Sequence, residues 1–444
     1  MNLIEAIYNA LRLPELRNKI LFTGGLLVAF RLFANISIPN ASQQALQQLF
    51  NSQALLGLLD LFSGGGLSTF SIVAMGVNPY INASIIMQLM TVISERVKEI
   101  SKEGEQGRRR ITRWTRYLTV ALALGQAYGY TVLFQNVNPP ILPASLDWFG
   151  RVTIMVTLTA GTVLAMWFGE LITEYGIGNG ISLVIFAGII GRGPRAVYSA
   201  VVGHTGANGL ADYLPFIVLV VLALAAIAFV IEVQQAVRKI PIQSAQRLTG
   251  GRTVQGRQSF LPLRVNQAGV IPIIFALSIM TFPGIVAGYL QATPSDTPWH
   301  NAALWVQGNF TYSSANITAA TAYNVLYFLF IFGFTYFYTA VTFDVHDVAD
   351  NLRRYSSFIP GIRPGRPTAE YLATVMNRVT FAGAIFLGLI TVVLPLGAAK
   401  LTNIPQNQMY LGGTALLIVV GVALDTMKQL ETQLVMRQYR GFIR

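Results

Sequence analysis

The sequence of 444 residues contains no cysteine and only three histidines, and 11% of its residues are charged. Without cysteine the chain can form no disulfide, no thiolate metal site and no cysteine nucleophile. The histidines, His204, His300 and His346, fall on segments that we expect on two sides of a membrane, so they predict no shared metal site. The sequence also lacks HExxH, GxSxG and a phosphate-binding loop with its lysine. We therefore expect no catalytic residue, no cofactor and no enzyme.

Hydrophobic residues make up 53% of the chain, and the mean hydropathy is +0.53. This composition is typical of a polytopic membrane protein rather than a soluble one. Ten mostly uncharged runs have the length that a membrane-spanning helix needs. They cover about 20–38, 73–93, 115–135, 152–173, 179–200, 214–234, 267–290, 319–342, 377–397 and 408–426. The sequence therefore predicts an all-α membrane protein with ten spans.

The distribution of positive charge predicts the orientation. An even number of spans puts both termini on one side of the membrane, and 26 of the 31 lysines and arginines fall on that side. The positive-inside rule identifies it as the cytoplasm. Three cytoplasmic loops, 94–114, 235–266 and 343–376, are longer and more basic than orientation requires. They could bind anionic lipid headgroups, or dock an acidic protein or an RNA.

A glycine-rich stretch precedes the second predicted span. Three consecutive glycines, Gly64 to Gly66, lower the helix propensity of residues 61–70 by roughly 1 kcal/mol per glycine relative to alanine. Non-helical backbone at membrane depth is tolerated only where it is buried in protein or lines a cavity. We therefore expect a re-entrant insert beside a cavity.

Two short patterns occur twice, in the same order, and predict an internal duplication into halves 1–200 and 201–444. Gly76-Val77-Asn78-Pro79 is matched by Gly269-Val270-Ile271-Pro272, and Gly180 to Gly188 is matched by Gly413 to Gly421. The repeats align Ile81 with Ile274 and Ile185 with Ile418. Duplicated membrane halves usually meet at a functional pathway.

The charged residues weigh against the alternative, an inverted-repeat secondary transporter of a small solute. Ion-coupled transporters hold a charged side chain near the bilayer midplane. Here Glu170, Glu174, Glu232 and Asp425 fall at cytoplasmic span ends, and Asp60 falls on the outer side. A transporter would explain the duplication and the insert, but not the uncharged midplane or the large basic loops.

Motifs from about residue 15 to the C-terminus give a resemblance to a known family. They are Phe62 to Gly65, Pro79 to Leu89 (PYINASIIMQL), Glu105 to Arg109 (EQGRR), Glu174 to Ser182 (EYGIGNGIS), Leu261 to Asn266 (LPLRVN), Ala349 to Leu352, Pro360 to Gly365 (PGIRPG) and Gly412 to Thr414. The chain resembles the SecY/Sec61-alpha family of protein-conducting channels. The resemblance implies two inverted, pseudo-symmetric five-helix halves around an hourglass pore in the bacterial inner membrane. Unfolded secretory chains would cross through the pore, and apolar helices would leave it sideways.

The resemblance also implies roles for individual residues. The pore ring would be Ile81, Ile85, Ile181, Ile185, Ile274 and Ile418. The plug, at about 57–70, would include Leu61, Phe62, Ser63, Gly64, Gly65, Gly66 and Leu67. The lateral gate would include Asn82, Ile86, Gln88, Ile271, Phe275 and Ser278. Partners would dock at Arg108, Arg109, Arg247, Arg252, Arg257, Arg353, Arg354 and Arg363. The implied partners are SecE, SecG, the SecA ATPase, the ribosome, signal peptides, nascent chains and anionic lipids.

Overall fold

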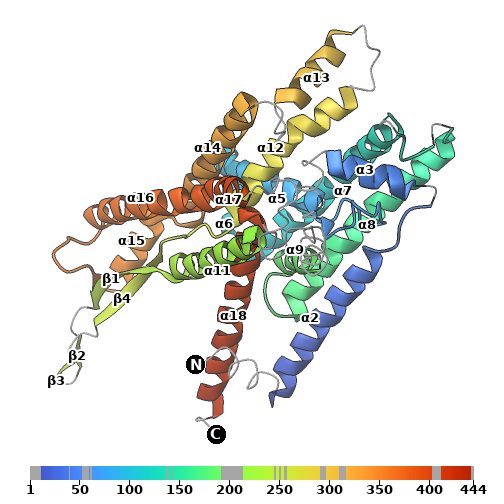
Figure 1. Cartoon of the computed structure of the whole chain (residues 1–444). Coiled ribbons are helices and arrows are strands. Elements are labelled where there is room, and N and C mark those ends of the chain that lie inside the picture. Colours follow the sequence, from blue (N-terminus) through green and yellow to red (C-terminus); the bar gives the residue numbers. More distant parts are fainter. Residues whose placement is uncertain are drawn as a thin grey trace.

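A computed structural model of the chain consists mainly of helices (Figure 1). It describes residues 12–39, 41–52, 60, 63–136, 139–143, 145–191, 214–244, 247–249, 252–254, 258–290, 297–309, 317–402 and 412–441. The helices are α2 (Pro14–Phe33), α3 (Gln43–Ser52), α5 (Asn78–Ile93), α6 (Glu95–Lys102), α7 (Glu105–Asn136), α8 (Trp148–Tyr175), α9 (Gly180–Ile190), α11 (Leu214–Gln235), α12 (Ile271–Leu290), α13 (Pro298–Asn309), α14 (Ile317–Thr342), α15 (Val345–Arg354), α16 (Arg366–Gly388), the π-helix η2 (Leu389–Val393), α17 (Leu394–Thr402) and α18 (Gly413–Gly441). The strands are β1 (Val237–Ser244), β2 (Arg247–Thr249), β3 (Arg252–Val254), β4 (Gln258–Arg264) and β5 (Ser357–Phe358).

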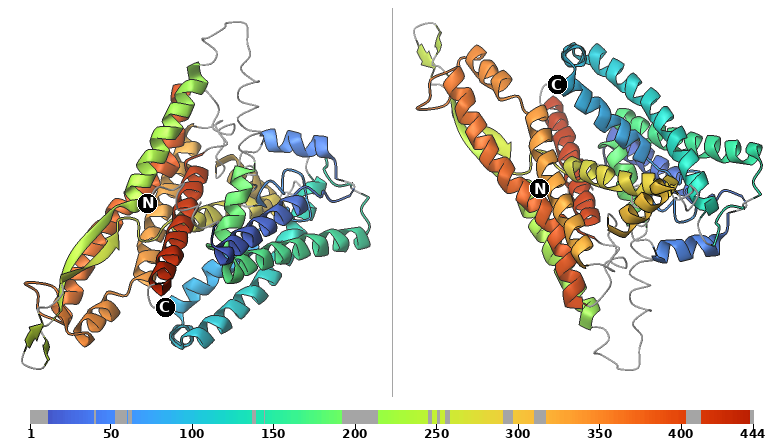
Figure 2. Two further views of the ribbon diagram at one scale, coloured as in Figure 1. Left: turned by 90° about the horizontal axis from the view of Figure 1, so that it is seen from below. Right: turned by 90° about the horizontal axis from the view of Figure 1, so that it is seen from above.

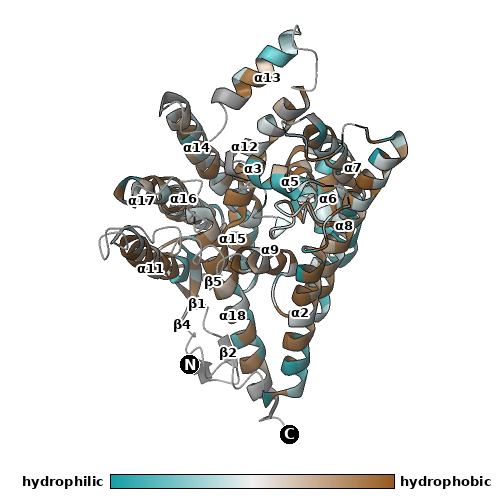
Figure 3. Ribbon diagram, turned by 45° about the vertical axis from the view of Figure 1, so that its right-hand side comes forward, coloured by the Kyte–Doolittle hydropathy of each residue, from teal (hydrophilic) through white to brown (hydrophobic). Residues whose placement is uncertain are grey.

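The predicted spans are found as helices. Six helical stretches within the described residues are long and apolar enough to cross a membrane: Glu105–Gln135, Trp148–Tyr175, Ile217–Gln235, Ala320–Arg354, Arg366–Leu401 and Gly413–Met436. The shorter apolar helices Gly180–Ile190 and Ile271–Gly284, together with α2 and α5, overlap the other four predicted spans. Figure 3 shows hydrophobic residues along these helices, and large apolar side chains such as Ile93 and Leu224 are exposed on them. Exposed apolar helix surface of this kind is what contact with lipid requires.

Some span boundaries differ from the prediction. Residues 73–77 form turns, and α5 begins only at Asn78, because Gly76 has a left-handed φ of 53° and Pro79 occupies the first helical turn. The ninth span is not a uniform helix, because the π-helix η2 interrupts it between α16 and α17. The C-terminal part of the fifth predicted span, residues 192–200, and the start of the tenth, residues 408–411, lie outside the described residues.

The helices form two groups that follow the order of the chain. Figure 2 shows the helices of residues 12–191 on one side of the molecule and most helices of residues 214–441 on the other. Contacts between the groups include α5 with α12, α7 with α12, and α9 with α18. The start of α2 and the last turns of α18 lie at one end of the molecule, and α13 lies at the opposite end (Figure 1).

The two long basic loops of the second half are more ordered than a loop prediction implies. Residues 237–264 contain the antiparallel strands β1 and β4, and β5 adds to β1, so the sheet order is β4-β1-β5. Side chains alternate along β1, and Ile240 packs with Leu263 of β4 and with Ile359, Leu372 and Met376. The loops 235–266 and 343–376 are therefore joined by backbone pairing into one unit, which we call the basic platform.

Candidate functional site

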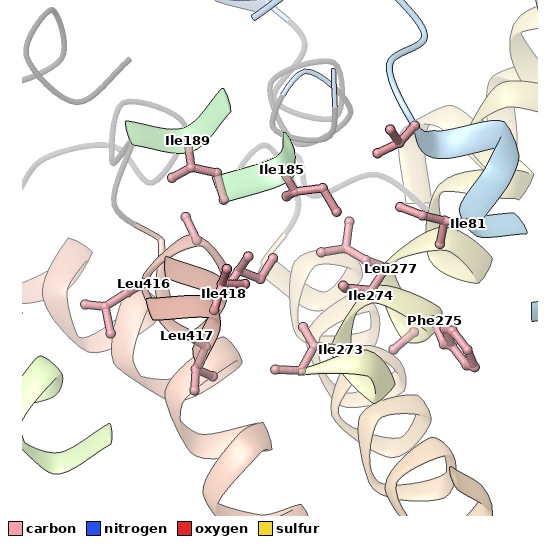
Figure 4. Packing of buried hydrophobic residues seen from close by; sticks show 14 of the residues in the cluster. Ile81, Ile185, Ile189, Ile273, Ile274, Phe275, Leu277, Leu416, Leu417 and Ile418 are labelled. Atoms are coloured by element: carbon pink, nitrogen blue, oxygen red, sulfur yellow. The ribbon is translucent and has the colours of Figure 1, made fainter. Parts of the chain in front are cut away.

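The six isoleucines of the predicted pore ring lie in or against one apolar cluster between the two groups of helices. Ile81, Ile85, Ile185, Ile274 and Ile418 are all buried members of this cluster, and the half-buried Ile181 packs against it. Figure 4 shows that Ile81 of α5, Ile185 of α9, Ile274 of α12 and Ile418 of α18 approach one another from four helices. Two of these helices come from each half of the chain, so the structure brings the residues of the predicted ring together.

Matched glycines set the starts of the helices that hold this cluster. Gly76 and Gly269 both adopt a left-handed φ, 53° and 63°, just before α5 and α12 begin. At the first residue of α9, a methyl group on Gly180 would lie 1.8 Å from the carbonyl oxygen of Gly169. At the first residue of α18, a methyl group on Gly413 would lie 1.7 Å from the carbonyl oxygen of Ile390. Only glycine permits this close approach of backbones.

Glycines shape the turn between the fourth and fifth spans. Gly176 ends α8, Gly178 has a left-handed φ of 88°, and the Asn179 side chain accepts a hydrogen bond from the Ser182 amide to cap α9. The turn fixes where α9 begins and therefore where Ile181 and Ile185 lie. Ile181 then packs directly on Gly169, where a side chain would collide with it.

A carboxylate organises the glycine-rich insert. Asp60 is fully buried, and its Oδ1 accepts hydrogen bonds from the Ser63 hydroxyl at 2.7 Å and from the Leu67 and Ser68 amides at 2.9 and 3.1 Å. These bonds satisfy backbone donors that a helix would otherwise pair. Of the predicted plug residues, Leu61 and Phe62 lie outside the described residues, whereas Ser63 to Leu67 are buried.

The far end of the insert is fixed to α2 and α7. Leu67 and Phe70 are buried in a second apolar cluster, and the Phe70 ring packs edge-to-face on Phe134 with the ring centroids 5.0 Å apart. The segment after α2 pairs with residues 70–72, since the Ile38 amide donates to the Phe70 carbonyl and the Ile72 amide donates to the Ile36 carbonyl. The insert is therefore a folded element packed between the segment after α2, α7 and α9.

Arg31, to which the sequence assigns no role, contacts the insert. Its guanidinium donates to the Gly64 carbonyl and, over 3.2 Å, to the Gly191 carbonyl at the end of α9. Asp60 and Arg31 are the site residues that the sequence left without a role. In the sequence each is a charged residue at the edge of an apolar run, which marks it as unusual. The local pattern does not identify the groups that it contacts.

The predicted gate residues occupy two helices in contact, α5 and α12. Asn82, Gln88 and Ile271 are half-buried, Ile86 is exposed, and Phe275 and Ser278 are buried. Gln88 Oε1 and Ser278 Oγ are buried and have no hydrogen-bond partner among the described residues. Phe275 packs edge-to-face on Phe334 and Tyr338 of α14, so its ring points toward α14.

The predicted docking arginines are spread over two regions. Arg108 and Arg109 are exposed at the start of α7, where Arg109 pairs with Glu105 at 2.6 Å. Arg353, Arg354 and Arg363 are exposed on the basic platform. Arg247 and Arg252 lie in strands β2 and β3 of the same region, and Arg257 lies outside the described residues.

The segment Asp344 to Asp347, which contains His346 and two carboxylates, has a structural role. The Asp344 carboxylate accepts hydrogen bonds from the His346 and Asp347 amides and caps the start of α15. In the part of the chain that the structure describes, no group of three or more His, Cys, Asp or Glu side chains could hold a metal ion. The site therefore consists of apolar packing, backbone contacts and cations.

Comparisons with known proteins agree with this architecture. The profile of the SecY family matches residues 71–427. The chain is 42% identical over 454 residues to the protein translocase subunit SecY of Streptomyces scabiei, covering 100% of both chains. It is similar in fold to a SecY structure in which the plug domain stabilises the closed state of the translocation channel, with a TM-score of 0.64, 17% identity and coverage of 94% and 92%. It is also similar to Sec61 in the canine ribosome-channel complex, with a TM-score of 0.59, 15% identity and the same coverage.

The match spans both groups of helices and the basic platform. The chain belongs to the SecY family.

Proposed function

We propose that this chain forms a protein-conducting channel, which moves unfolded secretory polypeptides across the membrane and releases apolar helices sideways into the lipid. The observation that carries the proposal is the convergence of the matched isoleucines from both halves, residues 1–200 and 201–444. A small-solute transporter needs polar groups at that position, whereas a channel for diverse polypeptides needs a surface to which no sequence adheres.

The isoleucine ring closes the pore by excluding water. Ile81, Ile85, Ile181, Ile185, Ile274 and Ile418 offer no hydrogen bond, so ions and protons lose their hydration without compensation and do not pass. A polypeptide held in the pore displaces these side chains, which fit around it through rotamer changes. The chain performs no bond chemistry in this process, so it is not an enzyme and the driving force comes from a partner.

The insert around Gly64 to Leu67 acts as a plug on the outer side of the ring. Hydrogen bonds to Asp60 hold this part of the insert together, so it can move while residues 69–72 stay paired with the segment after α2. Movement of the plug would open the pore to the polypeptide. The isoleucine ring would then be the seal around the polypeptide.

The α5–α12 contact serves as the lateral gate. An apolar segment of 20 residues gains roughly 6 to 12 kcal/mol in lipid, whereas one central Arg or Asp costs about 2.5 to 3.5 kcal/mol. The buried Gln88 and Ser278 atoms make closure of this contact less favourable, because each polar atom is desolvated without a partner. Separation of α5 from α12 therefore sorts segments by hydrophobicity.

The basic platform binds the energy-supplying partner, an ATPase such as SecA or the ribosome, through Arg353, Arg354 and Arg363. Their charge complements an acidic protein or the phosphates of an RNA. The smaller subunits SecE and SecG and anionic lipids complete the assembly in the bacterial inner membrane, with both termini in the cytoplasm. Arg363→Glu should abolish partner-driven export while the protein still inserts, and Arg151→Glu on the outer side is its matched control. Normal export by Arg363→Glu would contradict this docking site.

Reconstitution in liposomes tests the channel directly. Single-channel conductance is recorded before and after deletion of residues 60–70, and translocation of an unfolded secretory protein is measured in the same vesicles with an ATPase partner. We expect a quiet intact channel and a leaky deletion variant. No conductance in either form, together with saturable uptake of a small solute, would favour the transporter instead.

A further inference from the structure

Arg31 joins three segments that are distant in the sequence. It lies in the last turn of α2, and its guanidinium donates to carbonyl oxygens 33 residues away in the insert and 160 residues away at the end of α9. The Gly191 carbonyl belongs to the C-terminal end of α9, where unpaired carbonyls and the helix dipole favour a cation. A planar guanidinium can reach both acceptors at once, which a lysine ammonium cannot do equally well.

A glycine pair supports the same contact. Gly64 of the insert lies directly on Gly188 of α9, because a methyl group on Gly188 would be 2.4 Å from the Gly64 Cα. Two backbones in such contact have no side chains to interlock, so directional bonds have to hold them in register. The Arg31 bridge supplies these bonds at one end of the contact.

The next part of the insert is attached independently of Arg31. The Thr69 hydroxyl donates to the Ala34 carbonyl at 3.0 Å, and Ser37 and Ser71 form a backbone bridge. Residues 69–72 are thus paired with the segment after α2, whereas Gly64 lies on α9, and Leu67 belongs to the part around Gly64 because its amide donates to Asp60 and Ser63. Loss of the Arg31 bridge would loosen the part around Gly64 and Leu67 and leave residues 69–72 paired.

We propose that Arg31 is a latch that holds the insert against α9 and sets how readily the channel opens. This inference rests on the proposed function in one respect, since it assumes that displacement of the insert opens a pore. The latch couples the insert to the helix that carries Ile181 and Ile185, so the ring and the plug release together rather than separately.

Thiol labelling measures the latch without any transport assay. The chain contains no cysteine, so Leu67→Cys and Ser71→Cys, each made alone, report on buried positions on the two sides of the expected hinge. A membrane-impermeant maleimide is applied from the outer face of reconstituted vesicles. Arg31→Gln should raise the labelling rate of Leu67→Cys about tenfold, since two hydrogen bonds from a charged donor are lost. The rate at Ser71→Cys should not change.

Matched variants separate the latch from a general loss of structure. Arg31→Lys should give an intermediate rate, and Arg151→Gln, on an exposed arginine of α8, should give the unmodified rate. Gly191→Ala keeps the arginine but places a methyl group 3.0 Å from its Cζ, so it should raise the labelling rate of Leu67→Cys by a smaller factor. This variant tests the latch if the Arg31 variants do not accumulate in the membrane.

Two results would overturn the latch. One is an unchanged Leu67→Cys rate in Arg31→Gln, and the other is an equal rise at Leu67→Cys and Ser71→Cys, which would indicate local unfolding. Failure of the proposed function has a different signature, because then the unmodified protein would translocate nothing whatever the labelling rates.

Discussion

The helices α9 and α18 hold the same place in the two halves, yet they use their matched glycines differently. Their first glycines, Gly180 and Gly413, lie against backbone carbonyls at nearly identical separations. Their second glycines diverge, because Gly188 meets the backbone of Gly64, whereas Gly421 meets the side chains of Val270 and Gln234.

The difference separates what both halves share from what only one half has. The first glycine serves a helix crossing that each half needs for its own packing. The second glycine serves the insert, which has no counterpart at Gly421 among the described residues. The two halves are thus asymmetric at this backbone contact, and substitutions at the matched positions can measure how much that asymmetry matters.

The largest effect is expected at the shared glycines. Gly180→Ala and Gly413→Ala each place a methyl group within 1.8 Å of a carbonyl oxygen, so the two helices must separate. We expect each variant to lose more than about 3 kcal/mol of stability, because backbone cannot yield as side chains do. Size-exclusion chromatography in mild detergent should show little folded protein. A well-folded Gly413→Ala with a misfolded Gly180→Ala would break the equivalence of the halves.

The ring positions offer a second test of equivalence. Ile185 and Ile418 are both 1% exposed, so Ile185→Asn and Ile418→Asn each bury an unpaired amide at a cost of about 2 to 3 kcal/mol. The cost falls on the closed state, so both variants should leak ions and export substrates with weak signal sequences. Conductance in liposomes and export of a signal-sequence series measure this. Unchanged leak and unchanged stringency in both would remove these residues from the ring.

Gly188→Ala should have a moderate effect that is specific to the insert. The added methyl group would lie 2.4 Å from the Gly64 Cα, so the insert has to move away from α9. We expect this overpacking to cost about 1 to 2 kcal/mol of stability. The variant should fold and be leaky. In a protein that also lacks residues 60–70, the same substitution should have no further effect on conductance, and an additional leak there would contradict the assignment.

Gly421→Ala should have the smallest effect. Its methyl group would lie 2.9 Å from Val270 Cγ1 and 3.3 Å from Gln234 Nε2, which are side-chain atoms that can shift. Alanine also gains roughly 1 kcal/mol of helix propensity over glycine, which offsets the crowding. Thermal unfolding in detergent should therefore differ little from the unmodified protein, and conductance should stay quiet. A leak as large as that of Gly188→Ala would show that the halves are alike here too.

Local patterns in the sequence predicted much of this architecture. The paired Gly-Val-x-Pro segments predicted the duplication, and they mark the starts of α5 and α12 because left-handed glycine and first-turn proline act on their immediate neighbours. The alignment of Ile81 with Ile274 in these segments then predicted a common site.

Long-range contacts could not be predicted in this way. The partners of Arg31 and the pairing of β5 with β1 join residues far apart in the sequence, and nothing in either segment specifies the other. The hydrogen bonds from Ser63, Leu67 and Ser68 to Asp60 are local, but they replace a helix with a fold that propensity does not encode. The strands within the loop 235–266 were not predicted, because its dense charge masks the alternation of Ile240 and Ile242.

The pairing of β4 with β1 has a mechanical consequence. Strand β4 leads through the short segment 265–270 into α12, the Val265 amide donates to the Ala236 carbonyl at 3.0 Å, and Arg264 lies 3.7 Å from Asp425 of α18. A force applied to the basic platform would reach α12, which carries Ile274, through hydrogen-bonded backbone. It would reach α18, which carries Ile418, only through an exposed side-chain ion pair, so the platform is connected more stiffly to α12 than to α18.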